Sequence, residues 1–266
     1  MLTIQNYVKA ESLEEAYTLN QARSARSAGG MMWLRLGDKK IKTIIDLSNL
    51  GLDQIEETEE AFRIGAMCTL RQLELHSGLR DMFGDGIAEC VRHIVGVPFR
   101  NQATVGGSIY GRYGFSDVLT CLLVLDTYVE LYKGGVIPLT EFAAAKKDKD
   151  ILVSIVIKKD QRRLCYTSMR ITQTDFPILA CAAAKAENNE EQTWYFSVGA
   201  RPQRAALIEK QWKIRKDCSE DELRTYAGEA AETFSYGSNM RGSAKYRKHL
   251  AEVLIYRAVG EILAEE

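Results

Sequence analysis

The sequence predicts an α+β protein built from subdomains that follow one another along the chain. Residues 1–56 read as a small β/α unit, and residues 57–161 mix strand-like and helix-like segments. Residues 162–266 begin with the alternating apolar and polar residues of antiparallel strands and end with helical periodicity. We therefore expect two α/β subdomains followed by a C-terminal domain with a three-stranded antiparallel sheet and helices.

The first two subdomains alternate strands with short helices. A strand over 2–8 precedes a helix over 12–23, where Ser12 and Glu15 fit a capping box, as do Thr69 and Gln72 at the start of a second helix. The other expected elements are a short helix from Met31, strands over 43–48, 61–66 and 151–157, a helical stretch over 79–96, a helix over 116–126 capped by Ser116 or Asp117, and a hairpin over 127–139.

The C-terminal region contains three strand-like stretches, over 162–172, 176–187 and 193–201. The polar residues 187–192 are expected to form the turn between the last two strands. A capping box, Ser219 with Glu222, begins a helix over 219–234, and a longer helix over 243–263 closes the chain.

Composition limits the functional class. The chain has 266 residues, 46% of them hydrophobic, and a formal net charge of -1, which argues against a nucleic-acid footprint. No apolar run is long enough to span a bilayer. Residues 1–15 lack a basic start followed by an apolar core, so we expect no signal peptide and a cytoplasmic location.

Cysteine and histidine spacing predicts no metal site. The six cysteines form no C-x-x-C pair, and the three histidines stand apart from one another. The cysteines are therefore expected to be reduced thiols, mostly buried. The sequence also contains no evident catalytic dyad, so we assign no catalytic residue.

Two glycine pairs are the candidate binding elements. Gly29–Gly30 follows the first β/α unit, and Gly106–Gly107 lies in "ATVGGSI", where Thr104 and Ser108 add hydroxyl groups. Glycine loops before helices present backbone N–H groups to phosphate oxygens, although a single Gly-Gly is more often an ordinary turn. The sequence lacks both the G-x-G-x-x-G fingerprint and the P-loop motif.

The order of these motifs resembles a known family. "AGG", then "ATVGGSI" with Ser116–Asp117 following, then "TSMRITQTDFPILACAAA", "FSVGARPQRA" and "MRGSAKYRKHLAEVLIYRAV" look like the flavoprotein subunit of molybdenum hydroxylases. These are the FAD-binding medium chains similar to those of xanthine dehydrogenase and carbon monoxide dehydrogenase. The resemblance covers nearly the whole chain and implies an FAD-binding fold in residues 1–56 and 57–161, with a C-terminal flavoprotein domain in 162–266.

The resemblance also implies roles for individual residues. It places Asp117 against sugar hydroxyls of FAD and Tyr166 to Arg170 in the neighbourhood of the flavin ring. The first pyrophosphate loop is implied to comprise Ala28, Gly29, Gly30, Met31 and Met32, and the second Thr104, Gly106, Gly107, Ser108 and Ile109.

Two segments depart from the family pattern. Met31 and Met32 stand where a hydroxyl or acidic residue is usual, which leaves backbone N–H groups as the phosphate donors. After the second loop, "YGRYGF" replaces small residues and proline. This stretch is either a repacked surface loop or an altered flavin edge or acceptor site, where Arg112 would attract an anionic acceptor.

The function implied by the resemblance is electron transfer. FAD would be bound noncovalently and would pass electrons between an iron–sulfur subunit, which serves a molybdopterin-binding subunit, and NAD or another acceptor. Two alternatives stay open at this point: a stand-alone flavin reductase related to cell-wall enolpyruvyl reductases, and a flavin-free assembly module. The substrate is chosen in a subunit that this sequence does not contain.

Overall fold

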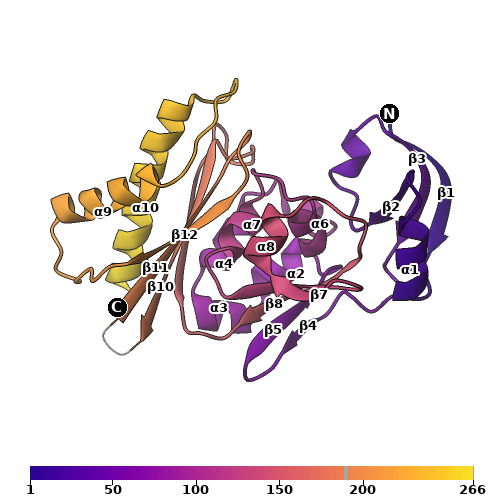
Figure 1. Cartoon of the computed structure of the whole chain (residues 1–266), viewed down its shortest axis with the longest axis horizontal. Coiled ribbons are helices and arrows are strands. Elements are labelled where there is room, and N and C mark those ends of the chain that lie inside the picture. Colours follow the sequence, from indigo (N-terminus) through magenta and orange to yellow (C-terminus); the bar gives the residue numbers. More distant parts are fainter. Residues whose placement is uncertain (189–190, 266) are drawn as a thin grey trace. The chain divides into compact units, whose positions relative to one another are not determined.

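The computed structural model describes residues 1–188 and 191–265 and divides the chain into two compact units (Figure 1). Unit 1 comprises Met1–Leu73, Val97–Gly111 and Thr127–Ile157. Unit 2 comprises Glu74–Gly96, Arg112–Asp126 and Lys158–Glu266. Each unit is therefore assembled from segments that are distant in the sequence.

Unit 1 begins with a small parallel sheet. Its strand order is β1-β3-β2, with β1 (Thr3–Lys9), β3 (Lys40–Asp46) and β2 (Ala25–Ala28). Parallel neighbours need a crossover connection, which helix α1 (Leu13–Asn20) and the 3-10 turn η1 (Leu34–Leu36) supply. Ala16 of the helix and Ile45 of the central strand are fully buried in one apolar cluster.

A five-stranded sheet forms the rest of unit 1. Its strand order is β4-β5-β8-β6-β7, and helices from three chain segments accompany it. The strands are β4 (Ile55–Glu57), β5 (Ala61–Gly65), β6 (Thr127–Leu131), β7 (Gly135–Pro138) and β8 (Leu152–Lys158); the helices are α2 (Leu70–Leu75), α5 (Val97–Arg100), α6 (Val105–Tyr110) and α8 (Leu139–Ala144).

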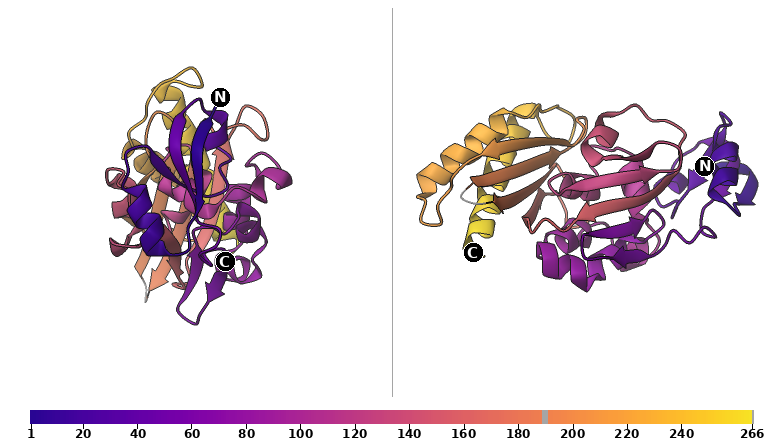
Figure 2. Two further views of the ribbon diagram at one scale, coloured as in Figure 1. Left: turned by 90° about the vertical axis from the view of Figure 1, so that its right-hand side faces the viewer. Right: turned by 60° about the horizontal axis from the view of Figure 1, so that its bottom comes forward.

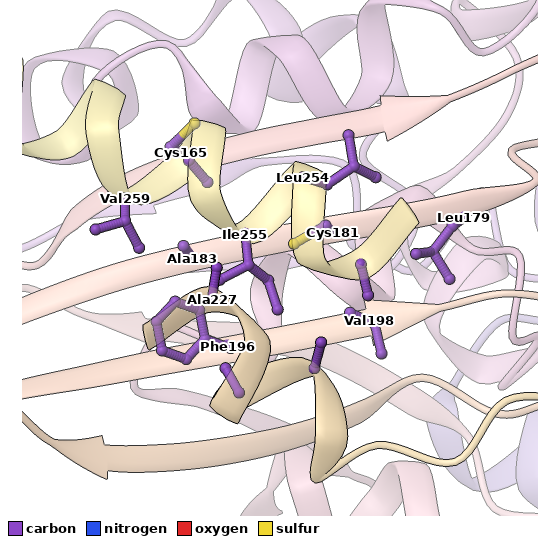
Figure 3. Packing of buried hydrophobic residues seen from close by; sticks show 14 of the residues in the cluster. Cys165, Leu179, Cys181, Ala183, Phe196, Val198, Ala227, Leu254, Ile255 and Val259 are labelled. Atoms are coloured by element: carbon purple, nitrogen blue, oxygen red, sulfur yellow. The ribbon is translucent and has the colours of Figure 1, made fainter. Parts of the chain in front are cut away.

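Unit 2 is organised by an antiparallel sheet of order β12-β11-β10-β9. Helices α9 and α10 pack on one face, where Cys181 and Phe196 contribute to a large apolar cluster (Figures 2 and 3). The elements are β9 (Arg163–Met169), β10 (Leu179–Asn188), β11 (Glu191–Gly199), β12 (Ala206–Gln211), α3 (Ser77–Phe83), α4 (Gly86–Arg92), α7 (Asp117–Leu122), α9 (Glu220–Glu232) and α10 (Ala244–Ala264).

The helix signals of the sequence are largely confirmed. Ser219 and Glu222 form the expected capping box, and Ser116, not Asp117, caps α7 by accepting from the Leu119 amide at 3.2 Å. The Thr69–Gln72 box is also formed. In α1 the Ser12 cap is present, but the Glu15 carboxylate accepts from the amide one residue further upstream.

Two fold expectations are wrong. The C-terminal sheet has four strands, because residues 206–211 add β12 at its edge; its charged and half-exposed side chains hide the alternation. The second glycine pair, expected in a loop, lies in the first turn of α6. Of the expected turn over 187–192, Asn189 and Glu190 lie outside the described residues.

Among the described residues no helix combines the length and apolar character that crossing a bilayer requires. The longest, α10, has 21 residues and alternates buried apolar positions with charged ones.

Arg247 anchors the loop before α10 to the sheet of unit 2. Its side chain is 1% exposed and donates to the carbonyls of Ile178, Gly237 and Gly242 at 2.6 to 3.0 Å and to Asn239 Oδ1 at 2.7 Å. Burial lowers the pKa of this guanidinium, because the charge leaves water for carbonyl dipoles.

We expect Arg247→Met to reduce the free energy of unfolding by about 3 kcal/mol or more, because it leaves several buried acceptors without donors. Urea denaturation measures this change. Lys248→Met is the matched control: Lys248 pairs with Glu232 at the surface, so its loss should cost less than about 1 kcal/mol. Equal effects of the two substitutions would contradict the anchoring role.

Candidate functional site

The first glycine loop of unit 1 follows β2 and packs directly against the backbone before α6. A Cβ on Gly30 would lie 1.7 Å from the carbonyl oxygen of Gln102, and a Cβ on Gly29 would lie 2.4 Å from Thr104 Oγ1. No side chain fits in either place. The sequence-predicted loops around Gly29 and Thr104 are therefore brought together in the structure.

The second glycine pair serves two different purposes. A Cβ on Gly106 would lie 2.5 Å from the Ala66 carbonyl oxygen, so this glycine permits close packing of α6 on β5. Gly107 is exposed, and a Cβ there would meet only Thr104 Oγ1, at 3.0 Å. Packing within the protein therefore explains Gly106 and leaves Gly107 with an open face.

Backbone donors are distributed unequally between the two loops. In the α6 turn, the amide of Gly106 donates to the Ala66 carbonyl at 2.9 Å, and the amide of Gly107 donates to Thr104 Oγ1 at 3.2 Å. In the part of the chain that the structure describes, the amides of Gly29 and Gly30 make no hydrogen bond to a protein group. The backbone N–H groups without a protein acceptor therefore lie in the first loop, at Gly29 and Gly30.

Met31 gives the first loop its unusual backbone. Its φ is 56°, in the left-handed region that non-glycine residues rarely adopt. Backbone of this kind clusters at binding sites, where consecutive N–H groups are turned toward one concavity. The Met31 carbonyl also accepts from the Arg35 amide at 3.0 Å, which fixes the turn that follows.

The other residues predicted to form the two loops are mostly buried beneath them. Ala28, Met32 and Ile109 are at most 7% exposed and pack into the apolar interior of unit 1. The Ser108 hydroxyl donates to the Thr104 carbonyl at 3.2 Å. Side chains at these positions shape the loops, and the open surface is mostly backbone.

In unit 2, Asp117, Tyr166 and Arg170 form a buried polar cluster. The Tyr166 hydroxyl and Nη2 of Arg170 both donate to Oδ1 of Asp117. Arg170 also donates through Nε to Ser168 Oγ at 3.2 Å and through Nη1 to the Asp175 carbonyl at 2.6 Å. The sequence-predicted set around Asp117 is thus assembled, and all three guanidinium nitrogens have partners.

Burial dominates the electrostatics of this cluster. Asp117 is 6% exposed, and its desolvation raises the pKa of the carboxyl to about 6, even though the Arg170 charge and the Tyr166 hydrogen bond act in the opposite direction. Burial and the neighbouring carboxylate also raise the pKa of the Tyr166 phenol well above its usual value. Tyr166 is therefore a hydrogen-bond donor at neutral pH.

The unusual "YGRYGF" segment is divided between the units. In unit 1, the Tyr110 hydroxyl donates to the Asp148 carbonyl at 2.9 Å. In unit 2, Arg112 is only 5% exposed and has a φ of 46°. Its charge is therefore not presented at the surface, and the expectation that it attracts an anionic acceptor is not supported.

Aromatic packing accounts for the rest of that segment. The rings of Tyr113 and Phe115 stack with centroids 5.1 Å apart, and Phe115 meets the edge of Phe176 at 4.7 Å. Of the two interpretations left open by the sequence, this packing favours a repacked loop.

Sequence reasoning missed the backbone partners of the glycines. Gln102 and Ala66 act through their carbonyl oxygens, and a carbonyl leaves no signature in residue type. Among the described residues, no group of histidine, cysteine and acidic side chains is placed to hold a metal ion.

The fold is that of an α+β protein in which two glycine-containing segments of unit 1 pack against each other. Comparison with known proteins gives the family. Residues 2–159 match the model for the FAD binding domain in molybdopterin dehydrogenase, and residues 164–262 match the CO dehydrogenase flavoprotein C-terminal domain. The chain belongs to this family of FAD-binding oxidoreductase components, which confirms the resemblance seen in the sequence and FAD as the cofactor.

Individual relatives agree with this assignment. The chain is 26% identical to the uncharacterized protein YgfM of Escherichia coli, over 95% of this chain and 94% of that protein. It is 22% identical to the glyceraldehyde dehydrogenase medium chain of Sulfolobus acidocaldarius, over 97% and 98% of the two chains.

Solved structures share the fold. A chain of reconstituted CO dehydrogenase from Oligotropha carboxidovorans superposes with a TM-score of 0.83 at 19% identity, covering 100% of this chain and 99% of that one. A chain of quinoline 2-oxidoreductase from Pseudomonas putida 86 gives 0.82 at 18% identity, covering 100% and 98%.

The packing of the loops predicts that two glycine substitutions differ greatly in their effect on stability. Gly30→Ala should reduce the free energy of unfolding by about 3 kcal/mol or more, because its Cβ collides with backbone that cannot move aside. Gly107→Ala should change it by less than about 1 kcal/mol, since the better helix propensity of alanine offsets a mild contact. Chemical denaturation of both variants measures these changes. Similar losses of unfolding free energy would contradict the conclusion that Gly30 is closely packed and Gly107 is not.

The raised pKa of Asp117 predicts a pH dependence of stability. The folded state binds this proton more tightly than the unfolded state, whose carboxyl keeps the ordinary value of 3.8. The contribution of this carboxyl to the free energy of unfolding is therefore lost as pH rises from about 4 to about 6. The loss is roughly 3 kcal/mol, because the pKa differs by about two between the folded and unfolded states.

Asp117→Asn cannot titrate and removes this dependence. The unfolding free energy of the wild type minus that of the variant should accordingly fall between pH 4 and pH 7. A difference that is flat, or that rises with pH, would show that the carboxyl is not shifted upward.

Proposed function

We propose that the chain holds the pyrophosphate of FAD on the loop Ala28–Met32, beside the turn that begins α6. The observation that carries this proposal is the close packing of Gly29 and Gly30 on residues 102–104, with the two glycine amides directed to no protein acceptor. Free N–H groups on a tight turn match phosphate oxygens, and a missing Cβ lets the phosphate approach.

The residues of the α6 turn would act at the edge of the same site. Gly107 leaves an open face, and Thr104 and Ser108 carry hydroxyls, while Gly106 and Ile109 hold the helix in place. This arrangement does not need the acidic or hydroxyl side chain that Met31 and Met32 replace, because main-chain donors carry the contact.

The cluster in unit 2 supports the predicted contacts to the rest of the cofactor. Tyr166 and Arg170 share Oδ1 of Asp117, so a sugar hydroxyl would be accepted by Oδ2. Arg170 is locked by Ser168 and Asp175 and fixes the direction of the carboxylate. Tyr166 and Arg170 would thus reach the flavin-ring neighbourhood as positioned neighbours rather than as acid–base groups.

We further infer that the chain works as the electron-transferring flavin component of a larger molybdenum-dependent oxidoreductase. The family name refers to molybdopterin dehydrogenases, and the Sulfolobus relative is named a medium chain. FAD, when bound, supplies the redox chemistry, and the chain's residues bind and orient it. Iron–sulfur and molybdopterin subunits, an acceptor such as NAD, and a cytoplasmic location belong to this proposal.

The decisive experiment is an absorption spectrum of the purified protein, followed by identification of the chains and metals that copurify. Flavin bands with molybdenum and iron–sulfur partners support the proposal. A colourless protein that takes up no FAD on reconstitution would overturn it and favour the flavin-free assembly module. Substrate turnover by the isolated, flavin-loaded chain would instead favour the stand-alone reductase.

Gly107→Asp should abolish FAD binding without unfolding the protein. The new carboxylate lies on the open face near the proposed phosphate, yet an acidic residue in the first turn of a helix is favourable to the helix itself. Gly107→Asn is the matched control, because it has the same shape without the charge. Flavin content and melting temperature should separate them: a Gly107→Asp protein with normal flavin content would refute the placement.

A further inference from the structure

Residues 148–150 of unit 1 lie just before β8 and form a short segment that we call the bridge segment. The Asp150 carboxylate is 9% exposed and accepts from the amides of Lys133 at 3.1 Å and Gly134 at 2.8 Å, in the turn between β6 and β7. Oδ1 of Asp148 accepts from the Asp150 amide at 3.0 Å, which closes a tight turn within the segment. The bridge segment is therefore fixed to the five-stranded sheet.

One side of the bridge segment holds the end of helix α1. Asn20, which is 5% exposed, donates through Nδ2 to the Lys149 carbonyl at 2.8 Å. Lys149 Nζ donates in return to the carbonyls of Gln21 and Ala22, both at 2.7 Å. Carbonyls at the end of a helix lack partners within the helix, and a cation beside them is favourable to the helix dipole. Strand β2 begins at Ala25 and leads into the first glycine loop, so the bridge segment holds the start of the chain that carries this loop.

The other side of the bridge segment holds the end of helix α6. Tyr110 is the last residue of this helix, and its hydroxyl oxygen lies 2.9 Å from the Asp148 carbonyl oxygen and 3.2 Å from the Asp150 carbonyl oxygen. A phenol has one proton to donate, so the two carbonyls share it. The ring is half-buried beside Phe142 of α8, with the ring centroids 6.1 Å apart. Tyr110 therefore ties the helix that begins with the second glycine pair to the bridge segment.

These contacts connect the two glycine loops at a second place. The first connection is the packing of Gly29 and Gly30 on residues 102–104. The second is the bridge segment, which contacts both the chain before β2 and the end of α6. Since α6 has six residues and is about 9 Å long, a displacement of its end moves the glycine pair at its start. The spacing of the two loops is therefore fixed by backbone packing and also by side chains at the bridge segment.

We propose that Tyr110 and Lys149 are positioning residues for the pyrophosphate of FAD, because they set the spacing of the two glycine loops through the bridge segment. This inference rests on the proposed function. A binding site depends on donors held within about 0.5 Å of the productive geometry, so the loss of either side chain weakens binding without removing a phosphate donor. The proposal also accounts for Tyr110, the first residue of the segment in which this chain departs from the family pattern.

Fluorescence titration of FAD into the flavin-free full chain tests this role. Tyr110→Phe removes the hydroxyl and keeps the ring beside Phe142. We expect its FAD dissociation constant to rise by about three- to tenfold, as for the loss of one hydrogen bond, and its melting temperature to stay within a few degrees of the wild type. Tyr236→Phe is the matched control. In unit 2 the Tyr236 hydroxyl donates to the Ala231 carbonyl at 2.8 Å, so its loss should have a similar effect on the melting temperature and none on FAD affinity.

Lys149→Met removes both donations to the end of α1, and we expect it to weaken FAD binding by a similar factor. Lys146→Met controls for the lost charge, because Lys146 is an exposed lysine that makes no hydrogen bond or ion pair among the described residues. It should leave FAD affinity unchanged. Since Tyr110 and Lys149 act through one segment, the double variant should lose less affinity than the product of the two single effects.

The wild-type titration separates this inference from the proposed function. A wild-type chain that takes up no FAD would overturn the proposed function, and the positioning role with it. If the wild type binds FAD, three results overturn the positioning role alone: unchanged affinity in Tyr110→Phe or in Lys149→Met, an equal loss of affinity in the matching control, or single effects that multiply in the double variant.

Discussion

The close approach of two backbone segments in unit 1 is the constraint on which the candidate cofactor site depends. Gly30 lies so near the Gln102 carbonyl that any side chain would have to displace main chain, and Gly106 has the same relation to Ala66. These contacts tie the loop after β2 to the start of α6, so the position of one loop fixes the other. Gly29, Gly30 and Gly106 are thus required by the packing of the fold, whether or not a ligand is bound.

This constraint also explains which donors remain for a ligand. The amides of Gly106 and Gly107 at the start of α6 donate to Ala66 and Thr104, whereas the amides of Gly29 and Gly30 have no protein acceptor among the described residues. Preorganised main-chain donors require no side-chain ordering when an anion binds. Met31 and Met32, which carry no polar side-chain donor, are compatible with the proposed phosphate site for this reason.

The sequence predicted those features that have a local cause. Capping boxes at Thr69 and Ser219 follow from side-chain chemistry within one helical turn, and both are formed. The strand β12 was missed because it is an edge strand with charged residues, so tertiary pairing and not hydrophobic alternation makes it a strand. The helical state of Gly106–Gly107 was missed because glycine is a poor helix former, and the Thr104 cap and packing on Ala66 outweigh that preference.

Candidate site residues show the same division between local and long-range causes. The order of the motifs predicted that Asp117, Tyr166 and Arg170 belong to one site. It did not reveal that burial raises the pKa of the Asp117 carboxyl to about 6. Nor did it reveal that every guanidinium nitrogen of Arg170 already has a hydrogen-bond partner. An ion pair whose arginine is already satisfied orients its carboxylate more than it attracts new charge.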